Sequence, residues 1–237
     1  MTRCSIIVAY AYLDELSPAR LACLAPFETE RADQFKAPHR RREFLCARVL
    51  LRAILERYTG HPAASHKLTV DARGKPICVD GPAVSIAHSG EIVVCAATDK
   101  GQIGVDIEMP GRRRNVAGIA NNYFAADEAA WLATQAEDRF YMLWVLKEAW
   151  LKAKGTGIAG GLGQLCCFVT PPDIEARMSD DPLPVLSLHT IDDAFVGLAT
   201  TTVPHEAVII SCWDPLSGEF DENSGAQLVA TTGPGTV

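Results

Sequence analysis

Two stretches of this chain decide its fold: Ile103-Gly104-Val105-Asp106-Ile107-Glu108 and the later Trp144-Val145-Leu146-Lys147-Glu148-Ala149-Trp150-Leu151-Lys152. In the first stretch, apolar and acidic residues alternate, which predicts a strand with Asp106 and Glu108 on one face. The second stretch has the composition of a helix, and it places Glu148 and Lys152 one turn apart on the same side. The sequence therefore predicts an acidic strand followed by a helix with a third acid.

These acids have a chemical implication. Residues two apart on one face of a strand lie roughly 7 Å apart, where two carboxylates repel by about 2 kcal/mol at an effective dielectric constant of about 20. Such a grouping is tolerable when it holds a hard divalent cation, and Mg²⁺ combines a few carboxylates with water and substrate phosphates. Lys152 is placed to meet one of those phosphates. Asp106, Glu108 and Glu148 are therefore candidate Mg²⁺ ligands in a site for phosphate chemistry.

A non-functional interpretation of each stretch also exists. A short acidic pattern occurs by chance in chains of ordinary composition. Glu148 and Lys152 can form an ordinary surface ion pair worth a few tenths of a kcal/mol. However, Glu148 is flanked by Trp144, Val145 and Leu151, which is an unusual setting for a solvated acid. The two stretches together, in this order, favour a functional site.

The composition sets the class of protein. The chain has 237 residues, 48% of them hydrophobic and 22% charged, with a net charge of −7. This indicates a globular protein of one large domain or two of about a hundred residues each. The negative charge argues against nucleic acid as the main partner, since that would need a basic surface. No apolar stretch approaches the roughly 20 residues of a membrane span, so we expect no membrane partner.

The eight cysteines predict a reducing compartment. They are scattered through apolar stretches without a C-x-x-C pair or a histidine at zinc spacing, which favours buried free thiols. The apolar run from Ile6 to Leu13 is followed by Asp14 and Glu15 rather than by a cleavage site, so it is read as a strand. The expected location is cytoplasmic.

Periodicity and turn residues predict an α+β fold. The expected helices are 18–24, 29–35, 40–58 (ended by Gly60), 126–135 and 138–154. The expected strands are 6–13, 67–71, 84–87, 92–98, the acidic strand from Gln102, 166–169, 185–190, 194–200 and 207–213. Each half is helix-rich first and strand-rich later, which predicts two similar α+β subdomains, 1–101 and 102–216, with a shared cleft. Residues 217–237 offer little to bury and are predicted to be disordered.

One motif is expected to be a decoy. Gly155-Thr156-Gly157-Ile158-Ala159-Gly160 matches the dinucleotide-binding pattern G-x-G-x-x-G. That pattern functions between a strand and the helix that it opens, whereas here it follows a helix. We expect Gly155 to end that helix in a left-handed conformation.

With Gly74-Lys75-Pro76 and Ser85-Ile86-Ala87-His88-Ser89-Gly90, the two stretches resemble the 4′-phosphopantetheinyl transferases of the broad-specificity, surfactin-synthetase-activating type. The resemblance runs in order from about Arg31 to Gly157. It implies transfer of the 4′-phosphopantetheine arm of coenzyme A to a serine of an acyl or peptidyl carrier protein, with release of adenosine 3′,5′-bisphosphate. It also implies a monomer of two pseudo-symmetric α+β halves with coenzyme A in the cleft between them.

The resemblance extends to individual residues. It implies Asp106, Glu108 and Glu148 as Mg²⁺ ligands and Lys152 at the pyrophosphate. From these positions we expect Glu148 to act as the general base, directly or through a metal-bound water. The residues implied at the coenzyme A phosphates are Lys75 and His88, with Ser85 and Ala87 lining that site, and Arg31 at the 3′-phosphate with Arg48 as a second candidate. Ala87 departs from the family, which usually has serine there, so one hydroxyl contact is missing.

Several of these residues also have structural interpretations. His88 can be a satisfied histidine near a strand end, Lys75 part of an ordinary turn, and Arg31 and Arg48 solvated side chains. The basic runs His39 to Arg42 and Arg112 to Arg114 are typical of solvated faces, although carrier proteins are acidic and Arg112 to Arg114 closely follow the acidic strand.

Two other classes of function stay open from the sequence. One is a different Mg²⁺-dependent phosphotransferase or phosphodiesterase, and the other is a non-catalytic module that binds carrier proteins. Which carrier proteins are modified does not follow from the sequence.

Overall fold

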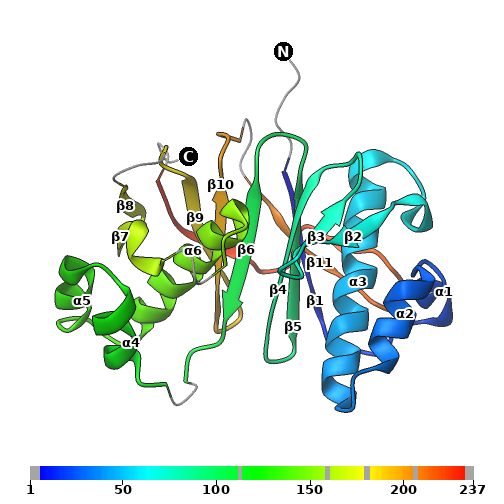
Figure 1. Cartoon of the computed structure of the whole chain (residues 1–237), viewed down its shortest axis with the longest axis horizontal. Coiled ribbons are helices and arrows are strands. Elements are labelled where there is room, and N and C mark those ends of the chain that lie inside the picture. The colour runs from blue at the N-terminus through cyan, green and yellow to red at the C-terminus, as the bar shows by residue number, and fades with distance from the viewer. Residues whose placement is uncertain (1–5, 112–113, 158–160, 179–181, 205–207, 233–237) are drawn as a thin grey trace. The chain divides into compact units, whose positions relative to one another are not determined.

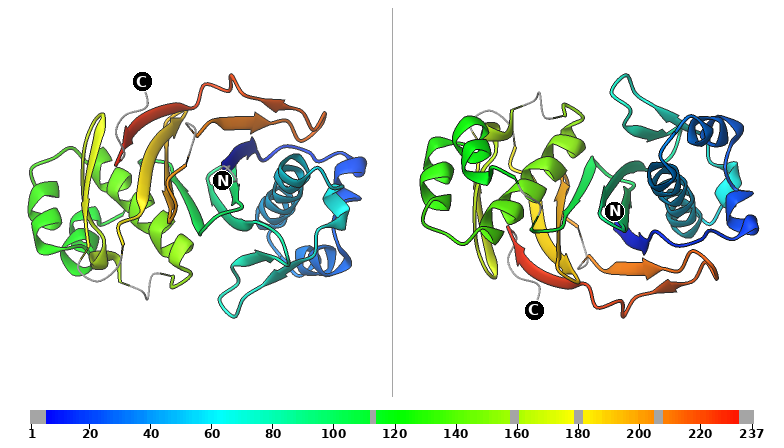
Figure 2. Two further views of the ribbon diagram at one scale, coloured as in Figure 1. Left: turned by 90° about the horizontal axis from the view of Figure 1, so that it is seen from above. Right: turned by 90° about the horizontal axis from the view of Figure 1, so that it is seen from below.

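The computed structural model describes residues 6–111, 114–157, 161–178, 182–204 and 208–232 (Figures 1 and 2). Helices and sheets are both present, so the predicted α+β class is confirmed. The chain divides into two compact units, the first of residues 1–100 and 204–224 and the second of residues 101–203 and 225–237. Residues 204–216, which the sequence assigned to the second subdomain, belong to the first unit because β11 (Ile210–Trp213) pairs with β1 (Ile6–Tyr12).

Proline and glycine mark several helix boundaries. The α-helices among the described residues are α1 (Pro18–Leu21), α2 (Pro26–Asp33), α3 (Pro38–Thr59), α4 (Val116–Tyr123), α5 (Ala126–Leu132) and α6 (Asp138–Lys154), with two 3₁₀ turns, η1 (Ala63–Ser65) and η3 (Leu162–Gln164). Gly60 ends α3 and Gly155 ends α6, both in the left-handed conformation with φ of 74° and 73°. The predictions for these two glycines are confirmed. Residues 158–160 of the glycine-rich motif lie outside the described residues.

Two short helices differ from prediction. Helix α2 begins three residues earlier than expected, because Pro26 occupies its first turn and Glu28 accepts a hydrogen bond from the Ala25 N–H. Helix α4 was not predicted, since Gly118 and two asparagines lower its helix propensity. The Asn115 side chain accepts a hydrogen bond from the Gly118 N–H and starts the helix.

In the first unit, α3 packs on a mixed five-stranded sheet. The strands are β1, β4 (Ala83–Ser89), β5 (Ile92–Thr98), β11 and β12 (Phe220–Asp221), in the order β12-β11-β1-β5-β4, beside a separate hairpin of β2 (Leu68–Val70) and β3 (Pro76–Cys78). The apolar residues of α3, among them Leu50, Leu51 and Ile54, are fully buried with those of β1 and β5. Figure 2 shows α3 lying along one face of this sheet.

A buried ion pair fixes α3 within the first unit. Arg52 Nε donates to Glu28 Oε2 at 2.8 Å, and both side chains are essentially buried. Arg52 also donates to the carbonyl oxygens of Ala63 and His66, at 3.0 and 3.2 Å. A buried charge is tolerated because it is paired and hydrogen-bonded, so Arg52 joins α2, α3 and the η1 turn.

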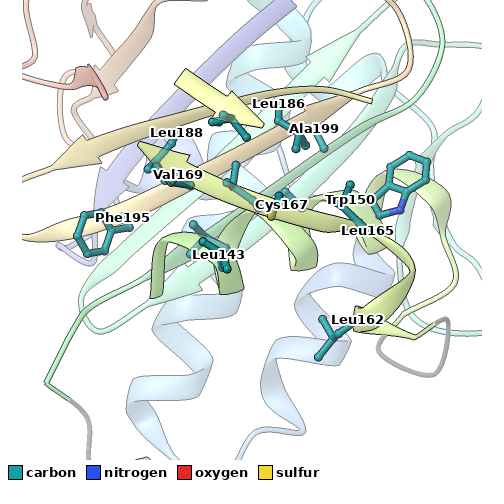
Figure 3. Packing of buried hydrophobic residues seen from close by; sticks show 14 of the residues in the cluster. Leu143, Trp150, Leu162, Leu165, Cys167, Val169, Leu186, Leu188, Phe195 and Ala199 are labelled. Atoms are coloured by element: carbon teal, nitrogen blue, oxygen red, sulfur yellow. The ribbon is translucent and has the colours of Figure 1, made fainter. Parts of the chain in front are cut away.

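In the second unit, α6 packs on a six-stranded sheet. The strands are β6 (Ile103–Glu108), β7 (Cys166–Thr170), β8 (Asp173–Arg177), β9 (Val185–Ile191), β10 (Ala194–Thr200) and β13 (Gln227–Thr231), in the order β6-β10-β9-β13-β8-β7. Figure 3 shows Leu143 of α6 packed with Val169, Leu188 and Phe195 of the strands. The expected acidic strand is confirmed as β6, in which Asp106 is buried together with Ile103, Val105 and Ile107.

A second buried ion pair fixes α6 within its own unit. Lys147 Nζ contacts both carboxylate oxygens of Glu128, at 2.6 and 2.8 Å. It also donates to the carbonyl oxygens of Leu162, at 3.0 Å, and of Leu165. Glu128 in turn accepts from the Ala125 N–H at the start of α5.

The prediction of disorder for residues 217–237 is wrong for the part that the structure describes. Residues 217–232 contain β12 and β13, and β13 pairs with β9 through Leu228 and Ala230. The segment has few apolar side chains, but backbone hydrogen bonds to an existing sheet do not depend on composition. Residues 233–237 lie outside the described part.

Seven cysteines are free thiols within the described residues, and five of them are buried. No helix in this part of the chain combines the length and the apolar character that a membrane span requires.

Candidate active site

Helix α6 lies directly on β6 and β10, and two glycines make this approach possible. A Cβ atom at Gly104 would lie 1.9 Å from the Ala149 carbonyl oxygen, and one at Gly197 would lie 2.4 Å from the Val145 carbonyl oxygen. Any larger side chain would therefore push the helix away. Glu148 lies in the helix between these two contact points.

The close packing brings Lys152 onto the acidic strand. Lys152 Nζ donates to Asp106 Oδ1 at 2.7 Å and to the Val105 carbonyl oxygen at 3.0 Å. Asp106 is only 9% exposed. Burial raises the pKa of its carboxyl group, while the Lys152 ammonium acts in the opposite direction.

Glu108, the second acid of β6, is paired with an arginine. Arg114 donates to Glu108 Oε1 at 2.7 Å, and its guanidinium carbon lies 5.7 Å from the centre of the Trp144 ring. Arg114 was considered above as a solvated or partner-binding residue, and the structure places it against the acidic strand. Arg112 and Arg113 lie outside the described residues.

Glu148 is partly buried between these charges. Burial, and then the negative charge of Asp106, raise the pKa of Glu148 to about 7, while Lys152 lowers it. Its buried Oε1 atom has no hydrogen-bond partner. An unsatisfied buried acceptor is costly, so this atom marks a position that a cation or a proton donor would stabilise.

A divalent cation at this site would need several oxygen ligands that face one position. No three His, Cys, Asp or Glu residues within the described part of the chain are arranged to hold a metal ion. Lys152 and Arg114 instead balance the charges of Asp106 and Glu108. The all-oxygen donors and the unsatisfied Glu148 oxygen fit a hard cation such as Mg²⁺, provided that the two basic side chains turn away from the acids.

The pKa of Glu148 predicts how the metal-free protein responds to pH. Because this pKa is raised from 4.5 to about 7, the contribution of Glu148 to stability is fully present below pH 4.5 and is lost as the pH rises through 7. Relative to Glu148→Gln, we expect the metal-free wild type to lose about 1–2 kcal/mol over this range, a partly exposed acid being screened by solvent.

The measurement is the thermal midpoint of both proteins from pH 4 to 8 in the presence of a chelator. The difference between the two midpoints removes the contribution of the carboxylates that both proteins share. If the two midpoints changed with pH in parallel, the raised pKa of Glu148 would be contradicted.

In the first unit, His88 lies against an acid of α3. The Nε2 atom of His88, near the end of β4, lies 3.2 Å from Glu43 Oε1, and the imidazole is 41% exposed. Arg40 and His39 also contact Glu43, at 2.7 and 3.8 Å. The basic run from His39 to Arg42, considered above as a solvated face, thus contributes two side chains to an ion-pair cluster.

The two candidate arginines have different environments. Arg31 is exposed on α2, where it donates to Gln34 Oε1 at 2.7 Å and lies over the Phe35 ring. Arg48 is buried over the Phe44 ring, and its NH1 atom has no hydrogen-bond partner. Burial lowers the pKa of the Arg48 guanidinium, so an anion beside it would be stabilising.

Lys75 and Ser85 lie on different elements. Lys75 is partly buried in the turn between β2 and β3, where Asp71 Oδ1 accepts hydrogen bonds from the backbone N–H groups of Arg73 and Lys75, both at 2.8 Å. Burial lowers the pKa of Lys75. Ser85 is buried in the middle of β4.

Comparison with known proteins identifies the family. The 4′-phosphopantetheinyl transferase superfamily matches residues 102–196, and the 4′-phosphopantetheinyl transferase N-terminal domain matches residues 29–98. These segments contain all the residues of the candidate site. The chain belongs to the 4′-phosphopantetheinyl transferase family, and is therefore a transferase. Enzymes of this family move phosphopantetheine from coenzyme A to a serine of a carrier protein.

Individual relatives agree with this assignment. The transferase HetI of Nostoc sp. is 34% identical over 187 residues, covering 75% of this chain and 78% of HetI. A putative transferase of Synechocystis sp. is 34% identical over 158 residues, covering 63% and 64% of the two chains. The transferase Sfp of Bacillus subtilis is 28% identical over 145 residues, covering 59% and 63%.

Proposed function

We propose that this chain transfers the 4′-phosphopantetheine group of coenzyme A to a serine of an acyl or peptidyl carrier protein in a Mg²⁺-dependent reaction, releasing adenosine 3′,5′-bisphosphate. The observation that supports this most strongly is the arrangement of Asp106, Glu108, Glu148 and Lys152 on β6 and α6. It lies in the segment that the superfamily matches.

Each side chain has a distinct role in the proposed reaction. Asp106, Glu108 and Glu148 would hold Mg²⁺, which when bound neutralises charge on the pyrophosphate. Lys152 would leave Asp106 and donate to the departing phosphate. Glu148 would accept the serine proton, directly or through a metal-bound water.

We further propose that the two units are pseudo-symmetric. In the first unit Glu28 pairs with Arg52 of α3, and in the second unit Glu128 pairs with Lys147 of α6. Each glutamate also accepts a hydrogen bond from the backbone N–H three residues before it. Each of the two buried cations also donates to the carbonyl oxygen of the first residue of a 3₁₀ turn and to that of the residue following the turn. This shared arrangement supports an origin by duplication.

Other parts of the proposal rest on the sequence and on the resemblance that it carries. They are the broad-specificity, surfactin-synthetase-activating type, the monomeric state, the cytoplasmic location and the placement of the active site between the two halves. All four stay predictions.

A mass measurement tests the proposed function. An apo carrier protein incubated with coenzyme A, Mg²⁺ and this enzyme should gain the mass of one phosphopantetheine. A panel of fatty-acid, polyketide and peptide-synthetase carriers, with the aminoadipate pathway carrier, would define the specificity. If carriers bind but gain no mass, the chain is a binding module. If coenzyme A is cleaved without transfer, it is a phosphodiesterase.

The exposed position of Arg31 leads to a ligand-specific prediction. If Arg31 holds the 3′-phosphate, Arg31→Ala should weaken coenzyme A binding about tenfold and leave 3′-dephospho-coenzyme A binding unchanged, because only the former carries that phosphate. Calorimetric titration with both ligands measures this. Arg41→Ala is a matched control, since Arg41 is exposed and paired with Asp33 in the same unit. Equal losses for both ligands would remove Arg31 from this role, and the same titrations on Arg48→Ala would test the second candidate.

A further inference from the structure

The carboxylate of Glu43 links two elements of the first unit. It projects from α3, is only 10% exposed, and contacts three side chains that can carry positive charge. Its Oε1 atom lies 2.7 Å from Arg40 NH1 and 3.2 Å from His88 Nε2. Glu43 Oε1 therefore contacts one side chain of its own helix, Arg40, and one side chain of β4, His88.

The second oxygen of Glu43 extends this cluster. Its Oε2 atom lies 3.8 Å from His39 Nε2, and His39 Nδ1 lies 3.5 Å from Glu91 Oε1. The side chains of Arg40 and His39 are about half exposed, whereas Glu43 is almost enclosed. An enclosed acid among more exposed basic groups restrains those groups and exposes little negative charge of its own.

This arrangement has a consequence for anion binding. A bare carboxylate beside a phosphate site would repel the ligand, but the Arg40 guanidinium balances the charge of Glu43. Contact with Glu43 through Nε2 fixes the orientation of the His88 ring. A ring held in this way loses less side-chain entropy when it meets a phosphate group.

We propose that Glu43 is a positioning residue that orients His88 for coenzyme A. This rests on the proposed function, in which His88 contacts a coenzyme A phosphate. In this role Glu43 would touch neither substrate nor metal. Its effect is therefore expected on the binding of coenzyme A rather than on the chemical step.

The experiment is a double-mutant cycle between Glu43 and His88. The proteins are wild type, Glu43→Gln, His88→Ala and the double variant. Asp33→Asn is the matched control, because Asp33 is an exposed acid of the same unit that pairs with Arg41. For each, calorimetry gives the Kd for coenzyme A, kinetics give kcat and KM for both substrates, and thermal unfolding gives Tm.

We expect Glu43→Gln to raise the Kd and KM for coenzyme A by about three- to thirtyfold, with kcat and the carrier KM changed less than about twofold. In the His88→Ala background the same substitution should change the Kd by less than about twofold, since Glu43 acts through His88. Asp33→Asn should bind coenzyme A like wild type. Glu43→Asp, which keeps the charge but shortens the side chain, should fall between wild type and Glu43→Gln.

Several results would overturn the inference. One is an unchanged Kd in Glu43→Gln with only a lower Tm, which would assign Glu43 a purely structural role. Another is an equal loss with and without His88. If Glu43→Gln does not fold, wild-type binding by Glu43→Asp would decide against the proposal. If His88→Ala itself binds coenzyme A normally, the proposed role of His88 fails together with the inference, and this outcome is distinguishable from the others.

Discussion

Glu148→Gln should lower turnover by roughly 10²–10⁴, the range for loss of a general base. Glutamine keeps the shape of the side chain but cannot accept the serine proton. At neutral pH the fold should be retained, because the substitution removes a partly buried acid that lies near Asp106. Single-turnover transfer to a carrier protein, with folding checked by thermal unfolding, measures the effect.

A magnesium titration separates the two roles of Glu148. If it acts mainly as the base, the variant should stay slow at saturating Mg²⁺, with its apparent Mg²⁺ requirement little changed. If it acts mainly as a ligand, excess Mg²⁺ should restore much of the rate by mass action. We expect the first result to dominate. Full rescue would assign the proton transfer to another group.

Gly104→Ala should damage both the fold and the activity. The new Cβ would lie 1.9 Å from the Ala149 carbonyl oxygen, so α6 must move away from β6. Overpacking against a helix backbone is expected to cost about 3 kcal/mol or more. Folded molecules should also lose about a hundredfold in rate, because Glu148 would shift by about 1 Å relative to Asp106.

Denaturant unfolding and single-turnover rates test this prediction. Gly74→Ala is the matched control, since Gly74 has a φ of +86° but nothing within 4 Å of its Cβ position. It should cost only about 1–2 kcal/mol of backbone strain and leave the rate of the chemical step unchanged. Wild-type stability in Gly104→Ala would mean that the helix does not rest on this strand.

The acidic strand and its helix were predictable from local patterns. Alternation placed Asp106 and Glu108 on one face of a strand, and helical spacing placed Lys152 one turn beyond Glu148. The structure adds direct contact between Lys152 and Asp106. These features depend on residues close in sequence, so periodicity carries the information.

The features of the fold and of the site that the sequence did not predict depend on contacts between distant segments of the chain. Nothing around Gly197 in the sequence indicates that the backbone of α6 lies over it. Glu43 was not singled out, because its partner His88 comes from another element. Strand β13 was missed for a similar reason, since it is held in the sheet by pairing with β9, which lies far away in the sequence. A signal did exist for Arg114, in its nearness to Glu108 along the chain.

The route of the chain after β10 has a consequence for synthesis and for gene truncation. Strand β1 is synthesised well before its parallel neighbour β11, because β2 to β10 lie between them in the chain. The same late segment then supplies β13 to the other sheet. Neither unit can be cut out as one continuous fragment. A stop codon just before Ile210 would therefore remove strands from both sheets at once.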